Sequence, residues 1–274
     1  MRSLGTSCYY RGLNNTGIYP VSTEKAARAI FAVPTVQALR LRSASSGAAL
    51  NSQRGAIKLI ELYSWYTSNG RKVSIALEEL GLPYEIHPID ITRGEQTTIE
   101  FMRVSPNGKI PAIVDQDAGG RTLMESGAIL LYLADKIGRL ISKDEDQRWR
   151  TIEWLMWQMG GIGPFLGQHL HFTHYKPDVS DYGKERYANE ARRLYGVLDQ
   201  RLVDHEYLAD DYSIADIATW PWIARHNWQR IDLNEYPHVR RWYVAIAERP
   251  AVQRGWRVPE NDQEIPMPVM GDEL

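Results

Sequence analysis

The sequence predicts a two-part fold, a small α/β unit followed by an all-helical unit. From Ile57 onward, strand-like and helical patterns alternate in the order β-α-β-α-β-β-α, which is typical of a small mixed sheet covered by helices. After residue 148, every periodic segment repeats at the helical spacing and none has the pattern of a strand. We therefore expect an α/β unit at 57–141, a helical unit at 142–256 and extensions at 1–56 and 257–274.

Each element of the first unit has its own signal: apolar runs for the strands, a 3.6-residue repeat for the helices and glycine-containing turns between them. Glycine is the residue that most readily closes a helix, and Gly81 follows the first helical pattern. In chain order the sequence predicts a strand at 57–63, a helix ending at Gly81, a strand at 84–89, a short helix at 99–104, strands in 109–115 and 121–125, and a helix at 126–138.

The second unit begins after a charged stretch at 142–148, which we interpret as a link. Helical periodicity follows at 149–159, 185–202, 213–226 and 238–249. The third of these segments opens on Ser213-Ile-Ala-Asp216, the spacing of a capping box in which two side chains satisfy each other's backbone N–H groups. We assign this pair a structural role.

Composition excludes several classes of protein. A net charge of −2, with nine tryptophans but no basic stripe beside them, argues against a nucleic-acid binder. No apolar run approaches the roughly 20 residues that a membrane helix needs. The single cysteine, Cys8, rules out an internal disulfide framework, a zinc ribbon or a Cys-x-x-Cys redox pair.

The N-terminal 56 residues differ from the rest, with seven basic residues against Glu24 alone and a stretch rich in Ser, Ala and Gly. This composition fits a mitochondrial or plastid transit peptide equally as well as a tail without targeting value. We expect a cytoplasmic protein, or a mitochondrial one if this segment is a transit peptide. The C-terminal Gly-Asp-Glu-Leu resembles an ER-retention signal but lacks its leading Lys or His, so we set it aside.

Two loops of the α/β unit could bind a ligand. Ile110-Pro111 opens a strand, and a cis bond there would present the backbone of Ile110 to an extended peptide. The pattern alone favours a trans proline, because cis bonds are about 5% of X-Pro bonds. Glu125-Ser126 begins a helix whose free N–H groups suit a carboxylate, while Glu125 could take an amine; the simpler interpretation is that Ser126 is a helix N-cap.

A third loop precedes the first helix, which starts near residues 68–70 in Ser-Trp-Tyr-Thr-Ser-Asn-Gly-Arg-Lys. A helix N-terminus stabilises a thiolate through its N–H groups and its dipole. This loop holds hydroxyls and one amide but no cysteine, histidine or carboxylate. If the loop is a site, its own residues leave open which group it activates and where the nucleophile lies.

Several separated motifs, in order, resemble the glutathione transferases, and most closely the nu-class disulfide-bond oxidoreductases and the yeast nitrogen-regulator-like group. The resemblance runs from about residue 57 to 256 and is carried by YTSNGRKVSIALEELGLPYE, SPNGKIPAIVD, ESGAILLYLADK, GPFLGQ, YSIADIATWPW and RWYVAIAERPAV. It implies a thioredoxin-like first unit, glutathione as co-substrate without a metal, and a homodimer. The reaction implied is disulfide reduction by a glutathione thiolate.

The resemblance also assigns roles to residues. Thr67 and Asn69 would stabilise the glutathione thiolate as catalytic residues, with Trp65 and Tyr66 forming the acceptor pocket for a thiol, disulfide or electrophile. The residues implied to bind glutathione are Gln96, Lys109, Ile110 before a cis Pro111, Glu125, Ser126, and Arg186 from the partner subunit of the dimer. Ser68 stands where the family commonly has proline.

Alternatives stay open at this point. The same thiolate could attack a carbon electrophile, giving conjugation, and the yeast regulator group uses this fold for partner binding without catalysis. Tyr66 is a second candidate for activating the thiol. His169, His171 and His174 invite a metal interpretation, but their spacing matches no known zinc pattern and cysteine ligands are missing.

Overall fold

The computed structural model describes residues 59–269. The N-terminal extension expected at 1–56 and the C-terminal Gly-Asp-Glu-Leu lie outside the described residues.

A four-stranded mixed sheet forms the first half of the described chain, as the alternation of patterns predicts. Its strands are β1 (Ile60–Ser64), β2 (Tyr84–Pro88), β3 (Ala112–Asp115) and β4 (Arg121–Met124), in the spatial order β2-β1-β3-β4. β1 pairs parallel with β2 and antiparallel with β3, and β3 pairs antiparallel with β4. The parallel pair requires a crossover, which α1 (Ser68–Leu80) supplies.

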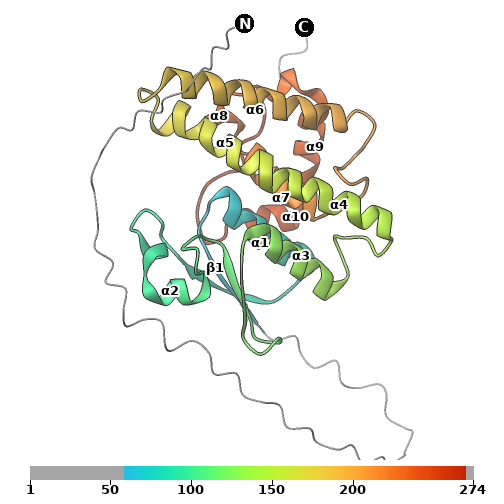
Figure 1. The fold of residues 1–274 in the computed structure, drawn as a ribbon. Coiled ribbons are helices and arrows are strands. Elements are labelled where there is room, and N and C mark those ends of the chain that lie inside the picture. The colour runs from blue at the N-terminus through green and yellow to red at the C-terminus, as the bar shows by residue number, and fades with distance from the viewer. Residues whose placement is uncertain (1–58, 270–274) are drawn as a thin grey trace, which may run out of the picture. The chain divides into compact units, whose positions relative to one another are not determined.

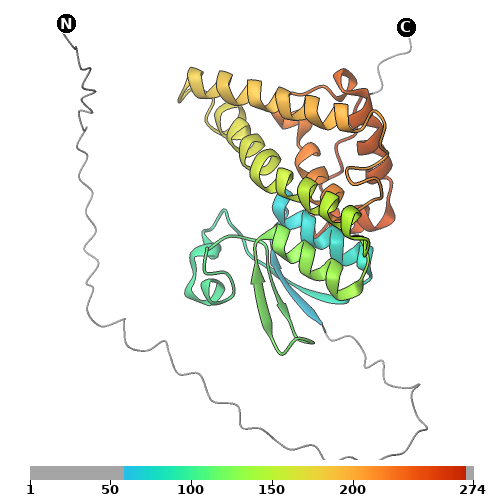
Figure 2. The same ribbon diagram turned by 45° about the vertical axis from the view of Figure 1, so that its right-hand side comes forward.

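Helices cover both faces of the sheet (Figure 2). α1 packs beside α3 (Ser126–Ile137) on the face toward the helical unit, while α2 (Ile99–Val104) follows the 3₁₀ turn η1 (Glu95–Thr97) and contacts β3 and β4. Gly81 closes α1 with φ of +68°, the left-handed conformation that glycine adopts at no steric cost. Ile129, Leu130 and Leu133 of α3 are fully buried, as their spacing predicts. This arrangement is the thioredoxin-like architecture.

The second half is helical and packs on α1 and α3 (Figure 1). Its elements are α4 (Glu145–Trp157), the π-helical turn η2 (Gln158–Ile162), α5 (Gly163–Leu170), the π-helical turn η3 (His171–Tyr175), α6 (Asp181–Arg201), α7 (Ile214–Ile223), α8 (His226–Gln229), the 3₁₀ turn η4 (Leu233–Glu235), α9 (Pro237–Ala247) and α10 (Pro250–Trp256). α7 lies against α1, α3, α4 and α9, so it is central to this half.

The charged stretch at 142–148 is only partly a link. Residues 145–148 form the first turn of α4, because Asp144 caps it by accepting a hydrogen bond from the N–H of Gln147 at 3.0 Å. Glu145 and Asp146 in that turn also favour a helix N-terminus. The interpretation of the whole stretch as a link was therefore wrong.

The capping box at the start of α7 is confirmed. The Ser213 side chain accepts a hydrogen bond from the backbone N–H of Asp216, and the Asp216 side chain accepts one from the backbone N–H of Ser213. Asp216 is fully buried. Asp216 also accepts from the N–H of Leu208 and from the indole of Trp242, so the cap joins α7 to α9.

The chain after α10 runs back along the helical unit. The Trp256 indole donates to the carbonyl of Gln263 at 2.8 Å, and the Tyr243 hydroxyl donates to that of Pro266 at 2.7 Å. The buried guanidinium of Arg71 stacks on the Trp256 ring, with its carbon 3.3 Å from the ring centroid. Within residues 59–269, none of the helices has the length and apolar character that a membrane crossing requires.

Candidate functional site

The N-terminus of α1 is shaped by a tight turn that follows β1. Thr67 is the N-cap, and its Oγ1 accepts a hydrogen bond from the N–H of Gly70 at 3.1 Å. An added Cβ at Gly70 would lie 2.1 Å from the carbonyl oxygen of Trp65, so only glycine fits this turn. Because the Thr67 oxygen acts as an acceptor in the cap, its hydroxyl hydrogen remains for another partner.

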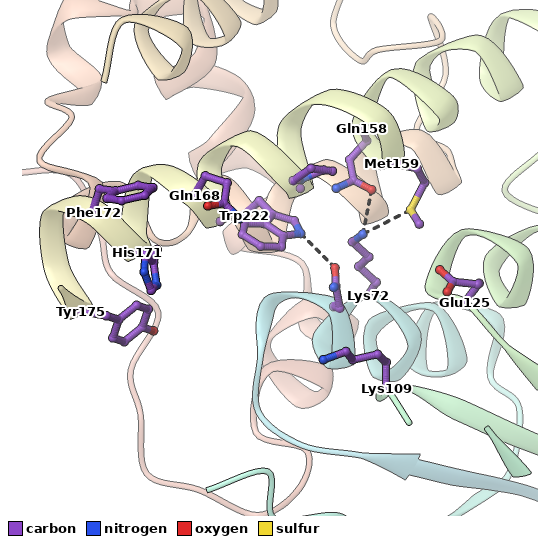
Figure 3. Close-up of a pocket in the computed structure, with 14 residues that line it drawn as sticks. Lys72, Lys109, Glu125, Gln158, Met159, Gln168, His171, Phe172, Tyr175 and Trp222 are labelled. Atoms are coloured by element: carbon purple, nitrogen blue, oxygen red, sulfur yellow. Dashed lines mark hydrogen bonds between the residues drawn. The ribbon is translucent and has the colours of Figure 1, made fainter. Parts of the chain in front are cut away.

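Asn69 lies on the first turn of α1 and contacts the helical unit. Its Oδ1 accepts a hydrogen bond from the indole Nε1 of Trp222 at 3.1 Å (Figure 3). An indole nitrogen can only donate, so the side facing Trp222 must be the amide oxygen. The NH₂ group of Asn69 is therefore the part of the amide left for a ligand.

The Ile110-Pro111 bond is cis, as the family resemblance implies and contrary to what the sequence pattern alone favours. The bond immediately precedes β3, and Ile110 lines a cavity together with Gln96 and Lys109. Gln96 lies on η1, and its Oε1 is buried with no hydrogen-bond partner among the described residues.

Glu125 and Ser126 stand where β4 gives way to α3. Glu125, not Ser126, is the N-cap, with φ of +69°, and its exposed carboxylate accepts from Asn107 at 3.3 Å. Ser126 is buried, and its hydroxyl accepts from the Lys72 ammonium at 3.2 Å. The interpretation of Ser126 as a simple helix N-cap was wrong, because the residue before it occupies that position.

Lys72 is a buried lysine that sequence reasoning missed. Its Nζ donates to Gln158 Oε1 at 2.7 Å and lies 3.6 Å from the sulfur of Met159 (Figure 3). The same Nζ also donates to Ser126 Oγ. Burial lowers the pKa of Lys72 to about 7, with Glu125 acting in the opposite direction. The available signal was its place three residues after Asn69, which puts both side chains on one face of α1.

The side-chain amide of Gln158 adds a further unused donor. Its oxygen accepts a hydrogen bond from the Lys72 ammonium, while its Nε2 is buried without a hydrogen-bond partner among residues 59–269. Lys72, Ser126 and Gln158 thus gather an ammonium, a hydroxyl and an amide NH₂ near the start of α3. Such a set of donors suits a carboxylate.

Two neighbouring cavities meet at Asn69. The larger measures about 800 Å³, and its lining includes Lys72, Glu125 and Gln158. The smaller measures about 390 Å³, and its lining includes Thr67, Gln96 and Ile110. The two share Asn69, Lys109, Gly167, Tyr175 and Trp222. Most of the predicted site residues therefore surround one continuous region between the two units.

Five of the predicted site residues line neither cavity, namely Trp65, Tyr66, Pro111, Ser126 and Arg186. Trp65 and Tyr66 contact each other, with ring centroids 4.6 Å apart, and line neither cavity, although the Tyr66 carbonyl accepts from Arg225. Arg186 is an exposed residue of α6 and also lines neither. Their assigned roles stay predictions.

The histidines of α5 and η3 have separate environments. His169 is buried, and its Nε2 donates to the Gln229 carbonyl at 2.8 Å, while burial lowers its pKa. His171 faces the larger cavity, and His174 stacks on Trp228. Among the residues that the structure describes, no three His, Cys, Asp or Glu side chains gather into a possible metal site.

Comparisons with known proteins agree with this geometry. Residues 67–136 match the family model of the glutathione S-transferase N-terminal domain, and residues 165–250 match that of the C-terminal domain. The disulfide-bond oxidoreductase YfcG of Escherichia coli K12 is 49% identical over 198 residues, which covers 70% of this chain and 92% of YfcG.

Solved structures resemble the chain to a similar degree. A glutathione transferase from Burkholderia graminis, with two glutathione molecules bound per subunit, is 46% identical with a TM-score of 0.69, covering 74% of this chain and 89% of that one. Another from Pseudomonas putida, with one glutathione disulfide bound per subunit, is 44% identical with a TM-score of 0.70, covering 76% and 94%.

Proposed function

The chain belongs to the glutathione transferase family, and from this premise we propose that it binds glutathione and uses it to reduce disulfides. The observation that carries the proposal is the pair of donors at the N-terminus of α1, the Thr67 hydroxyl and the Asn69 NH₂, at the junction of two cavities. The similarity to the disulfide-bond oxidoreductase YfcG and the glutathione ligands of the related structures support the same assignment.

The donors around the cavities match the groups of glutathione. The γ-glutamyl carboxylate would lie against the Ser126 hydroxyl and the Lys72 ammonium, and its amine against the Glu125 carboxylate. The backbone of Ile110 would pair with the cysteinyl residue as an added strand does, with Gln96 and Lys109 beside it. This placement would bring the sulfur to Thr67 and Asn69.

The thiolate is the reactive form of glutathione, and a free thiol has a pKa of about 8.5. Hydrogen bonds from Thr67 and Asn69, with the positive end of α1, would stabilise the thiolate. Each unit of pKa lowering corresponds to about 1.4 kcal/mol, which two or three donors can supply. The proton released goes to solvent.

The reaction then proceeds by two exchanges. The glutathione thiolate attacks one sulfur of the substrate disulfide, forming a glutathione mixed disulfide and releasing the other sulfur as a thiolate. A second glutathione thiolate attacks the glutathione sulfur of that mixed disulfide, giving glutathione disulfide and the second substrate thiolate. Two glutathiones are oxidised as one disulfide is reduced, and no cysteine of the chain takes part.

The test is retention on immobilised glutathione followed by turnover of hydroxyethyl disulfide. We expect binding and reduction, faster than conjugation to a chlorodinitrobenzene-type electrophile. The Cys8→Ser variant, which removes the single cysteine, should keep full activity. Conjugation as the faster reaction would favour a transferase role instead. Binding without turnover of the disulfide or of a panel of electrophiles would favour a regulatory protein.

We also propose that the protein is a homodimer in which Arg186 of each subunit approaches the glutathione of its partner. The position of Arg186, exposed on α6 and outside both cavities of its own chain, is compatible with this role.

A further inference from the structure

The indole of Trp222 lies against a glycine face of α5. Gly163 and Gly167 are one helical turn apart, and added Cβ atoms there would lie 3.6 Å and 3.5 Å from the Trp222 ring. A methyl group at Gly167 would be in ordinary van der Waals contact with the ring, and a side chain that extends beyond Cβ toward it would occupy the space of the ring. These glycines, which sequence reasoning left unexplained, let the indole lie close to the helix.

The backbone of Trp222 is also held by the helical unit. Its carbonyl accepts from Gln229 Nε2 at 2.8 Å, and the Gln229 side-chain oxygen accepts from the Tyr195 hydroxyl. His169 donates to the Gln229 backbone carbonyl. Tyr195, His169 and Gln229 are all buried, so ring and backbone are fixed by groups outside the α/β unit.

Trp222 acts on Asn69 through a single directional bond. The indole N–H has no acceptor capacity, so the 3.1 Å contact is satisfied only with Oδ1 toward Trp222. The opposite amide orientation would place two donors face to face and would present the amide oxygen to the cavity. An oxygen there would repel a thiolate instead of donating to it.

We propose that Trp222 is a positioning residue for the thiol chemistry, whose indole N–H holds the Asn69 amide with its NH₂ toward the glutathione sulfur. The inference rests on the proposed function of Asn69. It makes the helical unit responsible for the orientation of a group that lies on the α/β unit.

The test is the Trp222→Phe variant, which keeps an aromatic ring but removes the N–H. The ultraviolet absorbance of the thiolate gives the pKa of bound glutathione at saturation, and steady-state assays with hydroxyethyl disulfide give kcat and KM.

One neutral hydrogen bond corresponds to about a three- to tenfold effect. We expect the bound thiol to have a pKa higher by about half to one unit. At neutral pH, kcat should fall about three- to tenfold with KM for glutathione nearly unchanged, and the loss should disappear at high pH.

Trp220→Phe is the matched control. Trp220 lies on the same helix and donates its indole N–H to the Tyr243 carbonyl at 3.0 Å, outside both cavities. Its loss should leave the pKa of bound glutathione unchanged. In an Asn69→Ala background, Trp222→Phe should add no further effect, because its action passes through that amide.

The outcomes separate the inference from the proposed function. A bound thiol unchanged by Trp222→Phe but altered by Asn69→Ala would overturn the inference and leave the function standing. An effect of Trp222→Phe that persists in the Asn69→Ala background would also overturn it. No effect of Asn69→Ala would count against the proposed function itself. Should Trp222→Phe fail to fold, Gly167→Leu is the second variant, because it retains the tryptophan but pushes its ring away from Asn69. This variant must raise the pKa of the bound thiol for the inference to survive.

Discussion

Asn69 has two chemically different sides, and only one suits a thiolate. Its oxygen is occupied by Trp222, which leaves the NH₂ as the group available to a ligand. Thr67 has the same division of roles, since its oxygen caps α1 while its hydrogen remains to be donated. At the residue scale, then, hydrogen bonds within the protein occupy the oxygens of Thr67 and Asn69 and leave the O–H and the NH₂ to donate to a ligand.

Asn69→Asp tests this division. Aspartate has the same shape and can still accept from the Trp222 indole, but it has no N–H and carries a negative charge. We expect a loss of disulfide reduction at least as large as that of Asn69→Ala, and a bound thiol of higher pKa, with unchanged thermal stability. Activity near that of wild type would mean that the NH₂ of Asn69 is not a donor to the sulfur.

Lys72 predicts a pH dependence of ligand binding. Burial lowers its pKa to about 7, so the free protein holds an ammonium there below pH 7 and a neutral amine above it. A bound carboxylate favours the ammonium, so binding above pH 7 requires proton uptake. Affinity should be flat below pH 7 and then fall by up to about tenfold per pH unit until the pKa of the bound state is reached.

Titration calorimetry with S-methylglutathione, whose sulfur does not ionise, measures this dependence. Lys72→Met should weaken binding below pH 7 and remove the decline above it. Lys184→Met, at a surface lysine paired with Asp181 outside both cavities, should behave as wild type. Equal pH profiles for wild type and Lys72→Met would exclude Lys72 from the ligand site.

At the scale of elements, α7 connects the core of the helical unit to the site. Its capping box fixes the start of the helix, and Trp222 lies in its last turn. Asp216 accepts from Leu208, from Ser213 and from Trp242, and removing it would leave these buried donors unpaired.

We expect Ser213→Ala to lower the free energy of unfolding by about 1 kcal/mol. Asp216→Ala should lower it by about 3 to 5 kcal/mol, because several buried donors lose their acceptor. Denaturant titrations measure both changes in the free energy of unfolding. In the folded protein of either variant, the pKa of bound glutathione should stay unchanged. A shifted thiol pKa in Ser213→Ala would show that the cap has more than a structural role.

The elements that could be predicted from the sequence have strong periodic patterns, and the helix that was missed does not. The strands and helices of the α/β unit, and α4, α6, α7 and α9, have strong periodic patterns, and these predictions were confirmed within one to several residues at the ends. α5 was missed because Gly163, Pro164 and Gly167 have low helix propensity and interrupt the periodic pattern. The Trp222 ring packs on this face of α5, so tertiary contacts overrode local propensity there.

At the scale of the whole molecule, the proposed site combines residues that are close together and residues that are far apart in the sequence. Thr67, Asn69, Ile110 and Glu125 could be named because each belongs to a short motif that carries the family resemblance. Lys72, Gln158 and Trp222 could not, since their roles depend on how the helical unit packs on α1.

The homodimer proposal predicts complementation between defective subunits. If Arg186 acts on the partner's site, a heterodimer of Asn69→Ala and Arg186→Ala subunits contains one site with both defects and one intact site. Mixing the two inactive variants and allowing exchange should therefore restore activity. If Arg186 acted within its own chain, every site would keep one defect and the mixture would stay as inactive as its components.

The central claim is that the fold activates a sulfur supplied by the ligand. The most direct measurement is the pKa of the glutathione thiol when bound to the wild-type protein, followed by thiolate absorbance across a pH titration. The account predicts a value clearly below the roughly 8.5 of a free thiol, returning toward it in Asn69→Ala. A bound thiol that titrates as it does in solution would contradict the account.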